Sequence, residues 1–293
     1  MDIRVLKYFL AVVQEESVTR AAAKMHTTQP NLSRHMNLLE DELGCKLFER
    51  GSRKITLTEE GMFLHKRAKE IVELTERTES DIGLLKDAAS GIVHIGCIET
   101  HVMKLLGKTM KSLLETNPQI HYDFHSGSIA EITDWLDKGL LDFGVVVAPV
   151  DMKKYDYIKL PQHNYFGLLM KKDSPLSHLN YISPSDLGDY PLWVSHQQVE
   201  GNVLSSWLGK DVQSLNIIST FNLITTPAML IDEGIGAAFT FDQLVDTSEN
   251  SPFCFRPLKP AIEADIYIIW KKYQIFTRAS QAFLNELKWN LQQ

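Results

Sequence analysis

The sequence predicts an α/β protein with an all-helical head, one long connecting helix and a C-terminal α/β domain of two parts. Three observations carry this prediction. Apolar residues recur at helical spacing up to residue 44. A heptad-like apolar pattern then runs from residue 64 to residue 85. From residue 91 onward, strand-like runs alternate with helical patterns, which is typical of α/β domains.

Length and charge agree with this division. The chain has 293 residues, of which 44% are hydrophobic and 23% charged, so it is globular and long enough for about two domains. The net charge of −7 is 0 over residues 1–60, −1 over residues 61–90 and −6 over residues 91–293. A chain that is basic throughout and coats nucleic acid is therefore excluded, whereas a small DNA-reading module in the neutral head is not.

The sequence also predicts a cytoplasmic protein without a membrane segment. The N-terminus has no signal-peptide pattern, and no apolar stretch approaches the ~20 residues of a membrane span. Its three cysteines are odd in number and lack disulfide or zinc spacing, which favours a reducing compartment.

The head, residues 1–58, reads as a helix-turn-helix followed by a hairpin. Ser17 is a plausible cap for one short helix, and Thr28 begins a second helix that ends at Gly44. Its apolar stripe leaves polar side chains on the other face. Two short strands are then predicted around a turn at residues 51–54, which would form a wing.

The polar face of the second helix has the chemistry of DNA recognition. Gln29 and Asn31 can pair with adenine, and Arg34 can bind guanine or a phosphate. Hydroxyl groups suit phosphate oxygens, and cations in the wing would reach the backbone or the minor groove. The predicted DNA-binding residues are Thr28, Gln29, Pro30, Asn31, Ser33, Arg34, Arg50, Arg53 and Lys54. The alternative is a small helical bundle with a solvated polar face.

The connecting helix, residues 59–90, is predicted to pair with a second copy. Its seam positions are spaced 4-3-4-3-4-3, and five of the seven are apolar. The predicted dimerisation residues are Leu64, Ala68, Ile71, Ile82 and Leu85. The alternative is an ordinary surface helix on its own domain.

The C-terminal domain, residues 91–293, should contain largely parallel sheets in two subdomains with a cleft between them. Subdomain I is expected at about 91–161 and 266–293, and subdomain II at about 162–265. The strand-like runs are 91–97, 120–126, 142–147, 165–170, 191–195, 216–220, 236–241 and 264–270. The helical patterns are 101–116, 129–138, 199–208, 222–233 and 277–291.

The head resembles the winged helix-turn-helix of LysR-type transcriptional regulators. The match includes Q-P-N-L-S-R, L-E-D-E-L-G, L-F-E-R and T-E-E-G between residues 29 and 61, and the remainder fits as well. The resemblance implies a sequence-specific transcriptional regulator that binds an operator in double-stranded DNA. It further implies a dimerising linker helix, a regulatory domain built like a periplasmic binding protein, and a homodimer or homotetramer. Asn31 and His35 depart from the common family residues, so the operator sequence cannot be transferred.

The resemblance places a small-molecule effector between the two subdomains. By position, the effector-binding residues are Thr100, Ser128, Ser195, His196, Thr220 and Thr240. Helix N-termini favour anions, so an anionic effector is slightly favoured, although Glu99 beside Thr100 would oppose it. The alternative for Thr100 and Ser128 is simple helix capping.

Other classes of function find less support. The ten histidines show no metal-binding spacing, and no catalytic or nucleotide motif is present, so we expect no metal, no cofactor and no enzymatic activity. A solute-binding protein of the periplasmic type without a DNA role is the alternative, and the helix-turn-helix argues against it. The family's cysteine-pair redox sensor is not expected, because residues 160–250 contain no cysteine.

Overall fold

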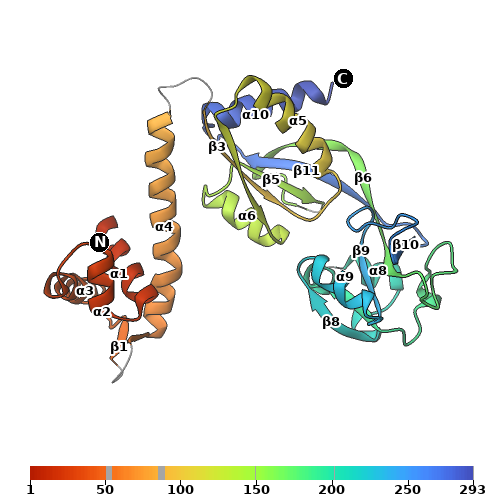
Figure 1. The fold of residues 1–293 in the computed structure, drawn as a ribbon, viewed down its shortest axis with the longest axis horizontal. Helices are drawn as coiled ribbons and strands as arrows, with labels where there is room; N and C mark the ends of the chain where they lie inside the picture. Colours follow the sequence, from red (N-terminus) through yellow and green to blue (C-terminus); the bar gives the residue numbers. More distant parts are fainter. Residues whose placement is uncertain (51–54, 85–89, 149, 201, 293) are drawn as a thin grey trace. The chain divides into compact units, whose positions relative to one another are not determined.

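The computed structural model describes residues 1–50, 55–84, 90–148, 150–200 and 202–292. The chain forms two compact units, Met1–Lys86 and Asp87–Gln293, which are considered separately below (Figure 1). Within the described residues, no helix combines the length and the apolar character that crossing a membrane requires.

The helices and strands predicted from the sequence appear along the chain in the expected order. The helices are α1 (Ile3–Glu15), α2 (Val18–Lys24), α3 (Gln29–Leu43), α4 (Glu59–Leu84), α5 (Met103–Thr116), α6 (Ile129–Asp137), α7 (His196–Glu200), α8 (Val203–Leu208), α9 (Thr225–Asp232) and α10 (Arg278–Asn290), with short 3-10 turns at Pro184–Asp186 and Val212–Ser214. The strands are β1 (Phe48–Arg50), β2 (Ile55–Leu57), β3 (Gly91–Cys97), β4 (Ile120–Ser126), β5 (Phe143–Val147), β6 (Tyr155–Lys171), β7 (Leu192–Ser195), β8 (Ile217–Phe221), β9 (Ala237–Phe241), β10 (Phe253–Pro257) and β11 (Glu263–Lys271). Strand β10, the first half of β6 and the division of 199–208 between α7 and α8 were not predicted from the sequence.

The first unit is a winged helix-turn-helix, as predicted. The Ser17 hydroxyl accepts the backbone N–H of Arg20 and so caps α2, while Gly44 ends α3 in the left-handed conformation with φ of 70°. Strands β1 and β2 pair antiparallel, with Phe48 opposite Leu57. Phe9, Leu32 and other apolar side chains of α1–α4 form one buried core.

The junction between the wing and α4 explains the T-E-E-G motif. The Thr58 hydroxyl donates to the Lys46 carbonyl at 2.7 Å and accepts the Gly61 N–H at 3.0 Å, which fixes the first turn of α4. Gly61 lies so close to the Leu47 carbonyl oxygen that any Cβ at this position would collide with it. The motif therefore fixes the first turn of α4 against the residues that precede the wing.

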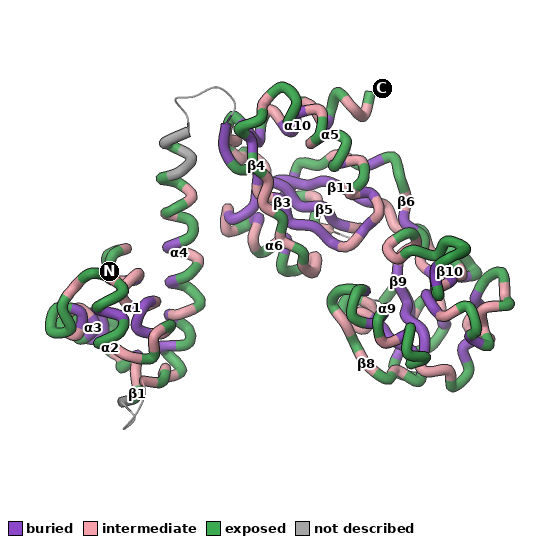
Figure 2. Tube along the Cα trace, in the orientation of Figure 1, coloured by how far each residue is buried: buried purple, intermediate pink, exposed green. Residues whose placement is uncertain are grey.

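The first half of the heptad pattern on α4 packs against the head of its own chain, whereas the sequence predicted a second copy of the chain as its partner. Leu64 and Ala68 are buried in the core of the head, where α4 packs on α1, and Ile71 packs half-buried against the same core. Buried, intermediate and exposed residues follow one another along α4 in Figure 2. These side chains bury their apolar surface within the chain, so Leu64 and Ala68 do not form an exposed seam. Ile82 is 60% exposed, and Leu85 lies outside the described residues.

The second unit is built on a sheet with the strand order β4-β3-β5-β11-β6-β9-β7-β8, with β10 beside β6. Strands β4, β3 and β5 are parallel, as are β8, β7 and β9. The strands β6, β10 and β11 run antiparallel to their neighbours. The sheet, which the sequence led us to expect as largely parallel, is therefore mixed, because β11 and β6 run antiparallel to β5 and β9.

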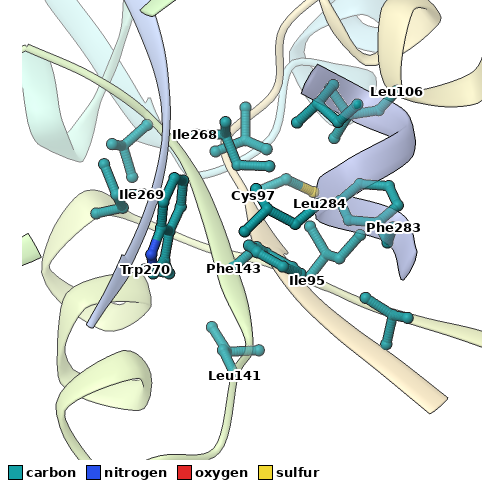
Figure 3. Packing of buried hydrophobic residues seen from close by; sticks show 14 of the residues in the cluster. Ile95, Cys97, Leu106, Leu141, Phe143, Ile268, Ile269, Trp270, Phe283 and Leu284 are labelled. Carbon is teal, nitrogen blue, oxygen red and sulfur yellow. The ribbon is translucent and has the colours of Figure 1, made fainter. Parts of the chain in front are cut away.

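Two large hydrophobic cores lie along this sheet in the described residues, beside a smaller cluster that contains Trp193, Ile224 and Ala238. The first contains Ile95, Phe143, Ile268 and Phe283, packed between β3, β5, β11 and the helices around them (Figure 3). The second is built around Leu168, Val194 and Phe239, in the part of the chain that contains β7–β10. Strand β6 contributes to both cores, with Leu160 in the first and Leu168 in the second, so it crosses from one half of the unit to the other.

Candidate functional site

The N-terminal turns of α3 present the residues predicted to bind DNA. Thr28, Gln29, Pro30, Asn31 and Arg34 are exposed, and Ser33 is half-buried. Leu32, Met36 and Leu39 face the core instead. The helix is thus held by its apolar stripe while its polar face stays open to solvent.

The contacts of Asn31, Arg34 and Thr28 add detail to the predicted DNA-binding surface. Asn31 Nδ2 donates to the Thr27 hydroxyl at 2.9 Å, so the Asn31 amide is already oriented by the turn that precedes α3. No ion pair of Arg34 is found within the described residues, so its guanidinium is available to a phosphate or a base. Thr28 precedes the helix but its side chain makes no capping hydrogen bond.

The wing is described only in part. Arg50 is the last residue of β1, and Arg53 and Lys54 lie outside the described residues. The start of the wing is fixed by Glu40, a buried carboxylate on α3. Its Oε1 accepts the Leu47 N–H at 2.9 Å and its Oε2 accepts from Lys46 Nζ at 2.6 Å.

The charge state of Glu40 follows from these contacts. Burial alone would raise the pKa of Glu40, but the hydrogen bonds from Lys46 and from the Leu47 N–H outweigh it and lower that pKa. The carboxylate is therefore ionised and paired at neutral pH. It connects the recognition helix to the strand that follows.

A cavity of about 670 Å³ lies in the second unit, where both cores contribute to its walls. It is of the size that small-molecule sites commonly have. Its lining residues are Ile98, Glu99, Ser126, Gly127, Ser128, Ala130, Glu131, Ser195, His196, Gln197, Gln198, Phe221, Asn222, Leu223, Phe239, Thr240, Phe241 and Leu244. The cavity therefore brings together four of the predicted effector residues, which are Ser128, Ser195, His196 and Thr240.

The remaining two predicted effector residues are placed elsewhere. Thr100 is 4% exposed and lines a neighbouring cavity of about 550 Å³. Its hydroxyl lies 3.0 Å from the buried Asn164 Oδ1 and accepts the Val102 N–H at 3.1 Å. Thr220 is an exposed residue of β8 and lines neither cavity, although the next residues, Phe221 and Asn222, line the first.

The N-termini of two helices near the cavity already hold carboxylates of the chain itself. Ser128 and Glu131 form a capping box at α6, in which the Glu131 Oε2 accepts the Ser128 N–H at 2.7 Å. Glu99 Oε2 accepts the N–H of Ile224, the residue before α9, at 2.7 Å. Two of the positions where an external anion would be most favoured are thus taken.

The charges around the cavity also disfavour an anionic ligand. Among the described lining residues there is no lysine or arginine, whereas Glu99 and Glu131 contribute carboxylates. Burial raises the pKa of Glu99, and the hydrogen bond from the Ile224 N–H offsets part of that effect. The sequence already signalled this opposition through Glu99, which immediately precedes Thr100 after the end of β3.

Comparison with known proteins decides the family. Residues 3–62 match the model for the bacterial regulatory helix-turn-helix protein, lysR family. Residues 86–292 match the LysR substrate binding domain, which alone covers more than half of the chain. The chain belongs to the LysR family. It is a DNA-binding transcriptional regulator with an effector-binding C-terminal domain.

Relatives of this LysR-type regulator match it along almost its whole length. HTH-type transcriptional regulator BsdA of Bacillus subtilis (strain 168) is 26% identical over 302 residues, covering 97% of this chain and 99% of that protein. HTH-type transcriptional regulator XapR of Escherichia coli (strain K12) is 27% identical over 277 residues, covering 94% and 93%. The crystal structure of CbnR, a LysR family transcriptional regulator, has a TM-score of 0.75 at 18% identity and covers 99% of both chains, which shows the shared fold.

Proposed function

We propose that this LysR-type regulator is a cytoplasmic protein without enzymatic activity that reads its operator through the N-terminal face of α3. Gln29, Asn31 and Arg34 would contact base edges, while Thr28, Pro30 and Ser33 would lie against the backbone. Arg50, Arg53 and Lys54 would add cations from the wing. The observation that carries this proposal is the exposed polar face of α3 above a fully buried apolar stripe.

The test of DNA binding is a titration of the full-length protein with the intergenic DNA that flanks its gene. We expect Arg34→Ala to weaken binding by about 1–3 kcal/mol, because a bidentate contact to guanine is lost. Arg34→Lys is the informative companion, since it keeps the charge but loses the guanidinium fork. Equal binding by all three proteins would remove Arg34 from the interface, and no protected site in a footprint would contradict the proposal.

We further propose that the chain forms a homodimer, or a tetramer of such dimers, in which two copies pair through the exposed side of α4. The structure leaves Ile82 and Leu74 exposed there by 60% and 41%, and Ile71 half-buried. Exposed apolar side chains on a helix that is charged elsewhere support a helical partner.

Sedimentation of the purified protein tests the pairing. We expect Ile82→Glu to shift the assembly toward smaller species, because a charge would be placed in a helix interface. Ile275→Glu is the matched control, since Ile275 is 96% exposed but lies in the second unit. An unchanged assembly in Ile82→Glu would place the interface elsewhere.

We propose, finally, that the effector in the 670 Å³ cavity carries a positive charge or an excess of hydrogen-bond donors. This reverses the slight preference for an anion that the sequence suggests. Glu99 and Glu131 occupy two helix N-termini at the cavity, and no lysine or arginine lies among its described lining residues. A carboxylate entering this site would meet acceptors and like charges, which disfavour it.

Thermal-shift measurements with matched compounds test the charge preference. Small amines and the carboxylates of the same carbon skeleton would be compared at equal concentration, because a ligand of the folded state raises its melting temperature. We expect the amines to stabilise the second unit more. A consistent preference for carboxylates would contradict the proposed charge while leaving the cavity as the site.

A further inference from the structure

Two histidines and an aspartate meet on strands β3 and β4, away from the residues assigned above. His94 Nδ1 lies 3.1 Å from Asp123 Oδ2, and His125 Nε2 lies 3.0 Å from the same oxygen. One ligand atom from each of the three side chains lies within 4.8 Å of the other two. The sequence held no metal-binding spacing because these residues come together only through strand pairing.

The sheet holds the three side chains on one face. His94 on β3 is the register partner of Asp123 on β4, and His125 follows two residues later on the same strand, so their side chains point to the same side. The backbone of His94 is held in turn by the buried Asp142, whose Oδ2 accepts the His94 N–H at 2.9 Å. The ring of His125 packs on Trp135 of α6, with 5.7 Å between the ring centroids.

We propose that His94, Asp123 and His125 form a binding site for a divalent transition-metal ion such as Zn²⁺. Two imidazole nitrogens and one carboxylate oxygen are ligands that zinc prefers, and three protein ligands leave a position open to water or another donor. Ligand atoms around a tetrahedral zinc ion at about 2.0–2.1 Å lie about 3.3 Å apart. The distances of 3.1 and 3.0 Å to Asp123 Oδ2 are close to this spacing.

The site is open to solvent and rests on a rigid base. The side chains of His94, Asp123 and His125 are exposed by 17%, 47% and 38%, so an ion can enter without rearrangement of the core. Strand β4 ends at Ser126, which lines the 670 Å³ cavity. A metal ion that ties β4 to β3 would therefore bind next to the strand end that shapes the effector site.

The alternative is a hydrogen-bonded set without an ion, in which both imidazoles donate to Asp123. The two cases differ in a measurable way. Isothermal titration of tag-free full-length protein with Zn²⁺ should show one site per chain. His125→Gln and Asp123→Asn should each weaken it roughly tenfold or more, since even partners behind a metal ligand contribute about that much.

His121→Gln is the matched control, because His121 is an exposed histidine of the same strand outside the cluster. We expect it to bind Zn²⁺ as the unchanged protein does. His94→Gln is added as a third ligand variant, and melting curves without metal verify that each variant is folded. No zinc binding by the unchanged protein, or an equal loss in His121→Gln, would overturn the proposal.

Discussion

The carboxylate of Glu99, at the end of β3, accepts the backbone N–H of Ile224 at the start of α9, with 2.7 Å between Oε2 and the nitrogen. One residue belongs to the part of the chain that builds the first core, and the other packs with the residues around Trp193 and Ala238. This hydrogen bond thus links the two halves of the second unit at the wall of the cavity, in addition to strand β6, which crosses between them. It also places a carboxylate where an effector would lie.

Replacing Glu99 should change which ligands the cavity accepts. Glu99→Gln keeps an oxygen for the Ile224 N–H but removes the charge, so an amine ligand should lose about 1.5–3 kcal/mol of binding free energy. Calorimetry with the amine that stabilises the protein most would measure this loss. Glu115→Gln, a change of the same kind on α5 outside the cavity, should bind as the unchanged protein does. A loss of equal size in both variants would show that Glu99 acts through general charge only.

Replacing Thr100 should affect stability rather than effector selection. Thr100→Val removes the hydroxyl that contacts the buried Asn164 and the Val102 N–H, and an unsatisfied buried polar group costs about 1–3 kcal/mol. Urea unfolding would measure the change in the free energy of unfolding. Thr100→Ser, which keeps the hydroxyl, should recover most of it. An effector response lost at full stability would instead return Thr100 to the binding site.

Glu40 should make the stability of the head depend on pH. Its pKa in the folded head lies below the ordinary value of 4.5, so the stability it contributes is present above that value and is lost as the pH falls through the lowered one. Glu40→Ala should cost about 1–3 kcal/mol at neutral pH, because the buried Leu47 N–H loses its acceptor.

The measurement for Glu40 is urea unfolding at several pH values from neutral to acid. Glu40→Ala should show a flatter acid limb than the unchanged protein. Asp41→Ala is the neighbouring control, since Asp41 is exposed, and it should stay within about 0.5 kcal/mol. The same acid limb in Glu40→Ala would assign the pH dependence to other carboxylates.

Two glycine replacements should change stability in opposite directions. Gly61→Ala places a Cβ against the Leu47 carbonyl and should destabilise the head by about 1–3 kcal/mol. Gly107→Ala, on the exposed side of α5 with open space around it, should stabilise its own unit by about 0.5–1 kcal/mol. Calorimetric unfolding would resolve both. A tolerated Gly61→Ala would mean that α4 can shift away from the wing.

Much of the fold could be predicted because the decisive signals are local. The caps at Ser17 and Gly44 and the alternation after residue 91 follow from short-range patterns, and the structure confirms them. Local sequence patterns do not reveal which helix an apolar stripe packs against. The spacing of Leu64 and Ala68 fits a second chain as well as it fits α1, and only the packed head shows which one they contact.

The candidate sites also differ in whether local sequence patterns reveal them. The residues predicted to read bases lie on the one continuous helix α3, so helical periodicity alone separates the exposed Arg34 from the buried Leu32. The cavity is assembled from the ends of many elements, and the position of Thr100 along the chain could not show that Asn164, far away in sequence, occupies its hydroxyl. His94 and His125 came together through strand register, which no spacing rule along one chain reports.

The pairing of β11 affects how the protein folds during synthesis. Strand β11 pairs with both β5 and β6, although β5 and β6 come much earlier in the chain. The first core therefore needs Ile268 of β11 and Phe283 of α10, which are synthesised late. The ribosome must therefore release the chain as far as α10 before that core can close, and such distant pairing is slow. The head, which is complete by the end of α4, can fold long before. A nascent chain would thus carry a finished DNA-reading module before it has a site for the signal that controls it.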